Sequence, residues 1–267
     1  MVSLFAKENK NEEPSAEILN PAGGSPVLLV CEHASNRIPP RYVNLGLTPE
    51  SSGSHAAWDP GALPLAKQMS EFLDATLVAG TVSRLVYDCN RPPESPAAIL
   101  DQSERIAIPG NIGLTESQRR ERVERTYEPF RRTVAGEILR RRGTQTALVT
   151  VHSFTPVYMG KRRDVEIGIV HDTDAKLADV MLDVAEREGA FKTSRNQPYG
   201  PRDGVTHTLK LHGIENGLPN VMLEVANNLL ETPEQQREVA ELLCCWLIEA
   251  LEANGFDLKT ETDRCRA

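Results

Sequence analysis

Polar side chains that can carry out chemistry follow four short apolar runs of the sequence. The runs VLLVC, RLVY, ALVTV and NVML lead in turn into His33, Asn90-Arg91, His152 and Glu224. In sheets covered by helices, ligands bind at the carboxyl ends of the strands. If these runs are neighbouring strands, the polar groups at their ends form one site.

The residue types favour metal-assisted hydrolysis. Two histidines at separate strand ends, together with a carboxylate, suit a catalytic zinc site that keeps one position for water. Zinc lowers the pKa of that water and polarises a carbonyl group, so His33 and His152 are candidate ligands. Glu224 is the candidate base that accepts the water's proton. The Asn90-Arg91 pair offers a planar fork for a substrate carboxylate.

Four further residues are candidates with alternatives. His55 and Asp59 lie four positions apart, so on a helical turn they share a face. His55 could then supply a ligand or a substrate contact, whereas Asp59 could simply cap the helix after it. His207 and His212 precede the last strand closely enough to share its pocket. One of them could stabilise an oxyanion or bind substrate.

Other chemistries have weaker support. Ser153 follows His152, but the chain has no G-x-S-x-G elbow, and it has neither a P-loop nor a G-x-G-x-x-G stretch. The five cysteines are odd in number and form no C-x-x-C pair, so we expect neither a disulfide framework nor a cysteine zinc site.

The elements that must position these residues alternate along the chain. The predicted strands are mostly continuous apolar runs, as in strands buried on both faces: Val27–Cys31, Thr76–Ala79, Leu85–Tyr87, Ala147–Val151, Val165–Val170 and Asn220–Val225. The predicted helices are Pro60–Leu73, Glu116–Arg142, Asp174–Glu188 and Pro233–Ala253. This alternation predicts an α/β three-layer sandwich with a mixed, largely parallel sheet. The apolar stripe of the last helix fits core packing, with an oligomer contact as the alternative.

Length and charge restrict the organisation and the partners. Residues 1–25 are polar and interrupted by Pro and Gly, which predicts a flexible tail before a single catalytic domain over 26–267. A net charge of −8 argues against nucleic acid or an anionic membrane as partner and favours a small molecule. We find no signal peptide or apolar membrane-spanning run, so we expect a cytoplasmic protein.

Six strings, in this order, resemble the N-formylglutamate amidohydrolase family: CEHASNRIP, HAAWDPGA, SRLVYDCNRPP, VHSFTPV, GVTHTLKLHG and PNVMLEVANNL. The resemblance extends from about Pro26 to Leu230. The family is similar to the zinc carboxypeptidases and aspartoacylases, which implies the same α/β fold and zinc as cofactor.

The resemblance also implies residue roles. It makes His33 and His152 metal ligands, Glu224 the general base and Asn90-Arg91 the carboxylate clamp. The relatives place a carboxylate ligand three residues after the first histidine, where this chain has Asn36. The third ligand must come from elsewhere, and the acidic position near the Trp-Asp string implies Asp59, with His55 as the competing choice.

The function expected is hydrolysis of the N-acyl amide of a small acidic amino acid, with N-formyl-L-glutamate as reference substrate. Two alternatives stay open. One is a carboxypeptidase-like or N-acyl-amino-acid hydrolase of other specificity. The other is a catalytically silent protein that binds a carboxylate. Other divalent ions could also take the place of zinc at such ligands.

Overall fold

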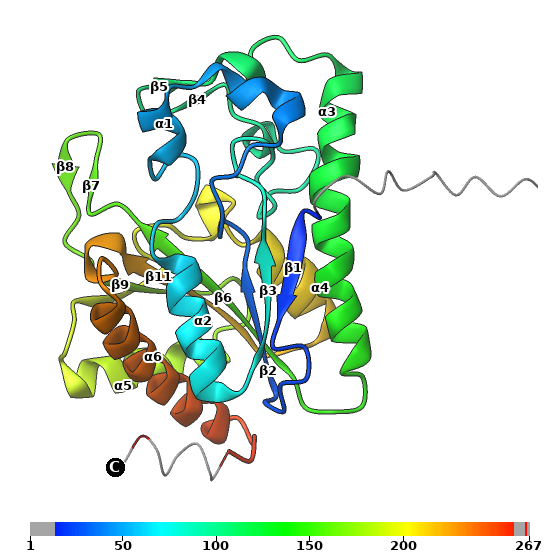
Figure 1. The fold of residues 1–267 in the computed structure, drawn as a ribbon. Helices are drawn as coiled ribbons and strands as arrows, with labels where there is room; N and C mark the ends of the chain where they lie inside the picture. The colour runs from blue at the N-terminus through cyan, green and yellow to red at the C-terminus, as the bar shows by residue number, and fades with distance from the viewer. Residues whose placement is uncertain (1–13, 259–264, 266–267) are drawn as a thin grey trace, which may run out of the picture.

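The computed structural model describes residues 14–258 and Cys265. Its centre is a seven-stranded sheet with the strand order β1-β3-β2-β6-β11-β9-β10 (Figure 1). The strands are β1 (Ala16–Leu19), β2 (Val27–Cys31), β3 (Thr76–Gly80), β6 (Ala147–Phe154), β9 (Ile167–Val170), β10 (Thr193–Arg195) and β11 (Asn220–Ala226). The four central strands β3, β2, β6 and β11 are parallel, whereas β1 and β9 pair antiparallel with their neighbours β3 and β11. The sheet is therefore mixed and largely parallel, as predicted.

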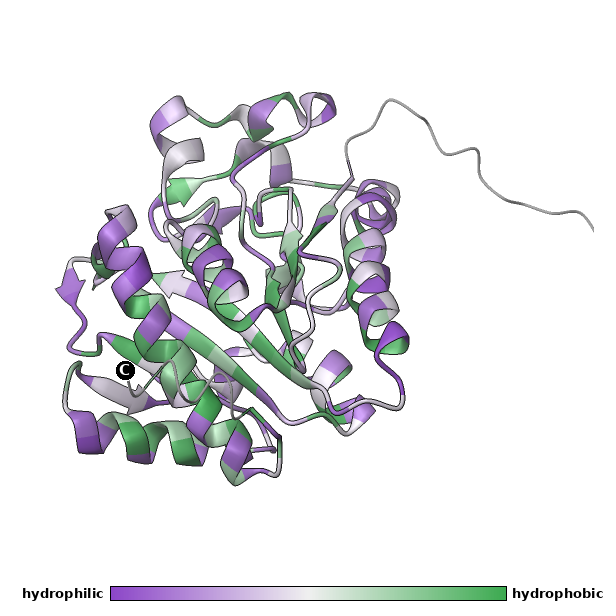
Figure 2. Cartoon of the chain, turned by 60° about the horizontal axis from the view of Figure 1, so that its bottom comes forward, coloured by the Kyte–Doolittle hydropathy of each residue, from purple (hydrophilic) through white to green (hydrophobic). Residues whose placement is uncertain are grey.

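Helices cover both faces of the sheet. α2 (Ala62–Leu73), α5 (Lys176–Glu188) and α6 (Pro233–Ala253) pack on one face, and α4 (Glu128–Arg140) packs on the other. Side chains of β2 alternate between the two cores: Leu29 lies with the α2–α5–α6 layer, and Leu28 lies with α4. Figure 2 shows the strands mainly in the hydrophobic colour and the helices in mixed colours, as two-sided burial of a sheet requires. The three-layer sandwich is confirmed.

The short run Leu85–Tyr87 is not a strand, contrary to the prediction. It lies in turns after β3, where Val86 N–H bonds to Ser83 O and Arg84 N–H bonds to Ala57 O. Its apolar side chains are buried against loops and the α4 layer rather than within the sheet. A short apolar run indicates burial but does not by itself distinguish a strand from a buried loop.

The expected tail is partly structured. Residues 16–19 form the edge strand β1, whose Ala16 pairs with Gly80 of β3. The prediction of a flexible tail is therefore wrong for residues 14–25, and residues 1–13 lie outside the described residues. The strand was missed because β1 is short and half exposed, so its pattern is weak. The same reason applies to β10.

The helix boundaries follow local caps. Thr115 and Gln118 form a capping box at the start of α3 (Glu116–Arg122), and Thr232 caps α6. The predicted long helix 116–142 is divided by a π-helical turn at Val123–Tyr127 into α3 and α4. Most apolar side chains of α6 are buried inside this chain, which leaves core packing as the explanation of its stripe.

Two small hairpins stand at the carboxyl ends of the central strands. One is formed by β4 (Gln102–Ser103) and β5 (Ile106–Ala107), close to α1 (Pro49–Gly53) in Figure 1. The other is formed by β7 (Val157–Tyr158) and β8 (Lys161–Arg162), and Figure 1 shows it projecting from the sheet. These hairpins border the site described below.

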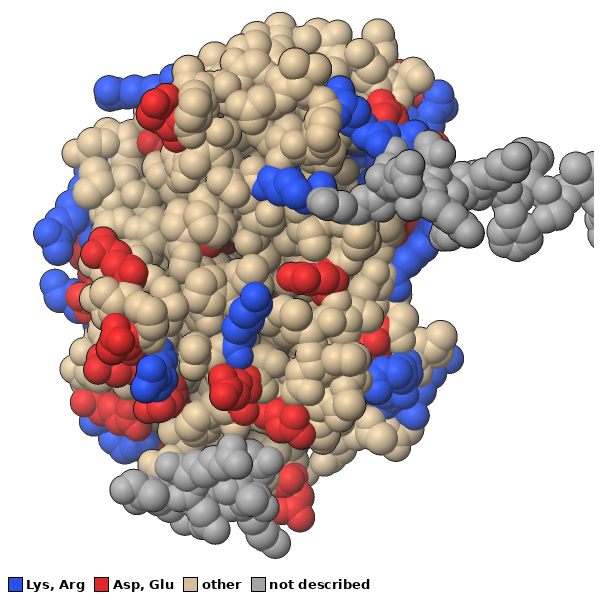
Figure 3. Space-filling view, viewed as in Figure 1, with Lys and Arg blue, Asp and Glu red and all other residues tan. Residues whose placement is uncertain are grey.

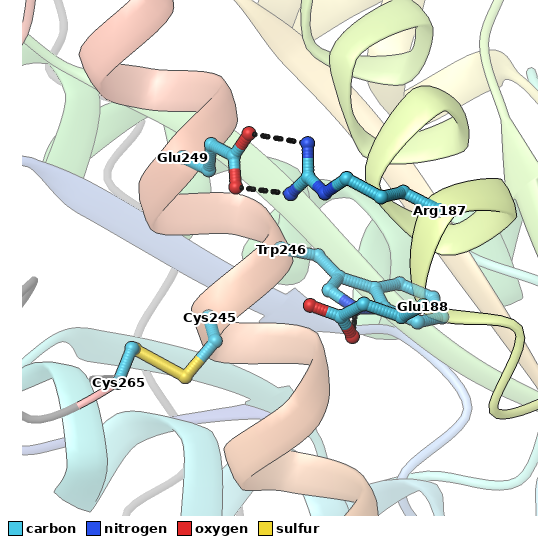
Figure 4. Close-up of a disulfide and its surroundings, with 6 residues drawn as sticks. All are labelled: Arg187, Glu188, Cys245, Trp246, Glu249 and Cys265. Carbon is cyan, nitrogen blue, oxygen red and sulfur yellow. Dashed lines mark hydrogen bonds and ion pairs between the residues drawn. A yellow bond between two sulfur atoms is a disulfide. The ribbon is translucent and has the colours of Figure 1, made fainter. Parts of the chain in front are cut away.

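A disulfide joins Cys245 of α6 to Cys265 (Figure 4). We expected no disulfide framework, and this single bridge was not predicted, because an odd number of cysteines without a C-x-x-C pair does not indicate which of them are joined. The face in Figure 3 carries acidic and basic side chains interspersed, with no continuous patch of either sign. No helix in the described part of the chain is both long enough and apolar enough to span a bilayer.

Candidate active site

Two histidines and an aspartate converge at the carboxyl edge of the sheet. His33 follows β2, His152 lies near the end of β6, and Asp59 lies in the turn before α2. Asp59 Oδ2 is 3.3 Å from His33 Nδ1 and 2.9 Å from His152 Nδ1. One ligand atom from each residue lies within 4.8 Å of the others, and all three residues are buried. The structure thus brings together the three residues that the family resemblance implies as metal ligands.

A second carboxylate lies behind each histidine. His33 Nε2 is 2.7 Å from Asp88 Oδ1. His152 Nε2 is 3.1 Å from Glu32 Oε2, although this contact is not aligned as a hydrogen bond. With Nε2 facing these carboxylates, Nδ1 of each ring faces Asp59, to which it donates in the protein alone and beside which it could offer its lone pair to a metal ion in place of that proton. The arrangement matches the carboxylate–histidine–metal pattern, so the three residues fit a divalent metal ion.

Arg84 joins the carboxylates of this cluster. Its Nη1 is 3.2 Å from Asp59 Oδ1 and its Nη2 is 2.9 Å from Asp88 Oδ2. Burial would raise the pKa of Asp59, but the charge of His33, hydrogen bonds with both histidines and the charge of Arg84 hold that pKa well below its ordinary range. Asp59 therefore stays an anion in spite of its burial.

Asp59 does not cap the following helix with its side chain. α2 begins only at Ala62, after a left-handed Gly61, and no side chain caps its first turn. The side chain of Asp59 is instead used by the two histidines and Arg84. The capping alternative for Asp59 is therefore wrong.

Glu224 faces the same cavity from β11. Its Cα is paired directly with that of His152 on the neighbouring strand β6. Burial raises the pKa of Glu224 to about 7, against the lowering effect of His152. A carboxylate with a pKa near neutrality is suited to accept a proton and return it.

These groups line one cavity of about 260 Å³. Its polar lining includes His33, His55, Asp59, Arg84, Asp88, Asn90, Arg91, Glu104, His152, Tyr199, Asp203 and Glu224. Its apolar lining includes Leu85, Ala97, Leu100, Phe154, Tyr158 and Val205. Cavities with an apolar lining and a few convergent polar groups are the usual form of small-molecule sites.

The Asn90-Arg91 pair lies in this cavity, but its two members differ in their contacts. The Asn90 side chain is buried, donates to Val205 O at 2.5 Å and accepts from Thr208 N–H at 3.0 Å. Its amide therefore holds the 205–208 segment in place. Arg91 donates to the Gly204 carbonyl and is partly exposed, so its remaining N–H groups can meet a ligand.

His55 lies at the edge of the cavity, outside the three-residue cluster. Its Nε2 is 2.5 Å from Glu104 Oε1, which connects the segment after α1 to the β4–β5 hairpin. Of the two choices for a third ligand, the structure brings Asp59 and not His55 to the histidines.

His207 and His212 are not among the residues that line this cavity. His207 Nε2 bonds to Tyr127 Oη at 2.8 Å, and the two rings are in contact. His212 is buried, and burial together with the charge of His207 lowers its pKa to about 4. The predicted oxyanion or substrate role does not fit this position, because neither ring reaches the cavity.

Ser153 is not arranged as a nucleophile. Its hydroxyl donates to Pro60 O at 2.6 Å and so fixes the turn before α2.

Sequence reasoning gave no role to four groups of the site: Glu32, Arg84, Asp88 and Tyr199. The first three lie inside the strings CEHASNRIP and SRLVYDCNRPP, and a charged residue beside a buried run was the available signal. Tyr199 lines the cavity and accepts a 2.8 Å bond from Arg163. Burial raises the pKa of Tyr199, so its hydroxyl keeps its proton.

Comparisons with known proteins identify the family of the chain. The model of the N-formylglutamate amidohydrolase family matches residues 25–231. A crystal structure of a gene product from Agrobacterium tumefaciens is 49% identical, with a TM-score of 0.89 over 91% of this chain and 97% of that one. An N-formylglutamate amidohydrolase from Ralstonia eutropha JMP134 is 16% identical, with a TM-score of 0.62 over 91% and 99% of the two chains, which shows the fold alone. No curated protein matches the chain. On the family match and the 49% identical relative, the chain belongs to the N-formylglutamate amidohydrolase family.

Proposed function

We propose that this amidohydrolase is a zinc-dependent enzyme that cleaves the N-acyl amide of a small acidic amino acid. N-formyl-L-glutamate is the reference substrate, and formate and the free amino acid are then the products. The observation that carries the proposal is the convergence of two Nδ1 atoms and a carboxylate oxygen beside Glu224 in one cavity.

His33, Asp59 and His152 would hold the metal through the atoms that already face one another. A bound Zn²⁺ ion would supply a Lewis acid and a water of near-neutral pKa. Asp88 and Glu32 keep the histidine rings oriented from behind. Arg84 keeps Asp59 and Asp88 in place from the cavity side.

Glu224 is the group that moves the proton. With a pKa near neutrality, its carboxylate can take a proton from the attacking water and then give it to the amine leaving group.

Arg91 binds the substrate carboxylate in this proposal. It lies at the cavity wall, and Asn90 next to it holds the wall by its contacts with Val205 and Thr208. An arginine that forks onto a carboxylate fixes orientation as well as affinity.

The test combines metal analysis with one variant. Purified protein is expected to contain about one zinc per chain, and Glu224→Gln should lower kcat for N-formylglutamate by about 10²- to 10⁴-fold while it retains the metal. Glu17→Gln changes an exposed carboxylate on β1 and serves as the matched control, with unchanged activity. Protein without bound metal, or full activity of Glu224→Gln, contradicts the mechanism. Tight carboxylate binding without turnover would favour the silent binding protein instead.

A further inference from the structure

Exposed apolar side chains lie at the mouth of the cavity. In the described part of the chain, eight large apolar side chains are at least 39% exposed: Ile18, Val43, Leu100, Ile112, Leu139, Val157, Tyr158 and Met159. Leu100 and Tyr158 line the cavity itself, whereas Val157 and Met159, which flank Tyr158 in the β7–β8 hairpin, do not. Two of the eight therefore lie at one opening. We call Leu100 and Tyr158 the apolar rim.

The hairpin that carries Tyr158 is anchored at its base by Arg163. The guanidinium carbon lies 4.7 Å from the ring centres of both Tyr158 and Tyr199, and 5.5 Å from that of Phe154. Arg163 also donates to Thr155 O at 3.1 Å and to Tyr199 Oη at 2.8 Å. These contacts hold the three rings as one wall. The rim is therefore a supported surface.

The rim continues inward as an apolar lining. Leu85, Ala97, Leu100, Phe154 and Val205 line the cavity. A formyl group has a single carbon, and the glutamate side chain ends in a carboxylate. Neither group offers an apolar end to contact these side chains. Exposed apolar surface that adjoins a pocket usually marks where a ligand binds.

We propose that the natural substrate carries an apolar group that lies against the apolar rim while its amide is cleaved at Glu224. This inference rests on the proposed hydrolysis of an N-acyl amino acid and specifies its substrate class. The apolar group has two sources, either an acyl chain longer than formyl or an apolar side chain on the amino acid. Both would be buried by the same contacts with Leu100 and Tyr158.

Two matched pairs of compounds separate these sources. N-hexanoyl-glutamate against N-formyl-glutamate tests the acyl group, and N-formyl-phenylalanine against N-formyl-alanine tests the side chain. We expect kcat/KM to be higher for the apolar member of at least one pair, by about tenfold or more. Calorimetric affinities measured with the Glu224→Gln variant should show the same preference without turnover.

Substitutions in the apolar rim then show where the preference in kcat/KM arises. Tyr158→Ala should lower the kcat/KM ratio of the pair that shows the preference at least about fivefold, because it removes a ring that the apolar group covers. Leu100→Ser, at a side chain that lines the cavity and is already exposed, tests the same contact if Tyr158→Ala folds poorly. Val43→Ser removes an apolar side chain that is 80% exposed and lies outside the cavity, so it should leave both ratios unchanged.

The outcomes are distinguishable. Ratios near one in both pairs, or ratios that the rim variants do not change, overturn the inference, and turnover of N-formyl-glutamate would still support the proposed function. Conversely, absence of turnover in every compound overturns the proposed function. A binding preference with Glu224→Gln that the rim variants abolish would still support the apolar site.

Discussion

At the scale of single residues, the site buries more negative than positive charge. Glu32, Asp59, Asp88 and Glu224 are each at most 5% exposed, and Arg84 is the arginine that bridges two of them. Buried carboxylates need compensation by protons, cations or hydrogen bonds. In the protein alone, raised pKa values of the two histidines and of Glu224 supply it through protons. A divalent cation would supply the same compensation, which is a physical reason for these residue types to lie together.

Single-residue surroundings also explain why the histidines of this chain differ in pKa. His33 and His152 have carboxylate partners on both sides, so their pKa values are raised. His212 is buried without such a partner, and its pKa falls to about 4. The unfolded chain binds a proton at this residue near pH 6.5, whereas the folded protein does so only near the lower value. His212 therefore contributes stability above about pH 6.5 that is lost as the pH falls toward 4.

We accordingly predict that His212→Gln is less sensitive to acid than the parent protein. Between about pH 7 and pH 5, the free energy of unfolding should fall by about 1–2 kcal/mol less in the variant. Urea unfolding at both pH values measures this difference, and the other titrating groups cancel because they are common to both proteins. Parallel losses in the two proteins would show that His212 is not held neutral by the fold.

At the scale of elements, the sequence indicates the central strands and the polar groups at their ends, but not how loops close over the site. The runs of β2, β6 and β11 are strongly apolar, so their positions and the side chains beyond them could be predicted. Arg84 could not be assigned, because its position depends on the turn that replaces the expected strand at Leu85–Tyr87. The rim hairpin likewise carries no strong pattern, since β7 and β8 have two residues each.

Strand packing behind Glu224 gives a second prediction. Gly168 of β9 is the Cα partner of Glu224, and a Cβ at Gly168 would lie 1.8 Å from the carbonyl oxygen of Gln197 and 3.2 Å from Glu224 Cβ. Gly168→Ala must therefore displace the segment that carries Tyr199. We expect a loss of about 1–3 kcal/mol in unfolding free energy, together with lower kcat/KM.

Gly136→Ala is the matched control for this substitution. Gly136 lies inside α4, and an added Cβ there meets no atom within 4 Å. It should stabilise the protein by about 0.5–1 kcal/mol and leave activity unchanged. Equal effects of the two substitutions on thermal unfolding and activity would contradict the close packing at Gly168.

At the scale of the whole molecule, a net charge of −8 does not conflict with an anionic substrate. The charges on the face in Figure 3 are of both signs, whereas binding of the proposed anionic substrate would depend on the local field of Arg84, Arg91 and a bound cation. The length of the chain also has a structural explanation. Residues from His33 to Glu224 contribute to one cavity, so the parallel strands and their crossovers are needed to bring the two ends together.

The disulfide acts at this scale, because it attaches the end of the chain to the helix layer opposite α4. Cys245 and Cys265 are separated by 20 residues, and Cys265 packs against the α2–α5–α6 core. Close by, Arg187 pairs with Glu249 at 2.7 Å and Trp246 Nε1 donates to Glu188 at 2.6 Å, which join α5 to α6 (Figure 4). These contacts hold the layer without the bridge, so the disulfide acts mainly by restricting the unfolded chain.

Cys265→Ser should therefore lower stability without changing the active site. The loop-entropy model for this separation gives about 3 kcal/mol, or about 6–12 °C in Tm for a chain of this size. Differential scanning calorimetry should find that dithiothreitol lowers the Tm of the parent protein to that of the variant, and leaves the variant unchanged. A variant as stable as the oxidised parent would mean that the bridge restricts little in the unfolded chain. Unchanged kcat/KM in the variant would separate this stabilising role from the chemistry at the opposite edge of the sheet.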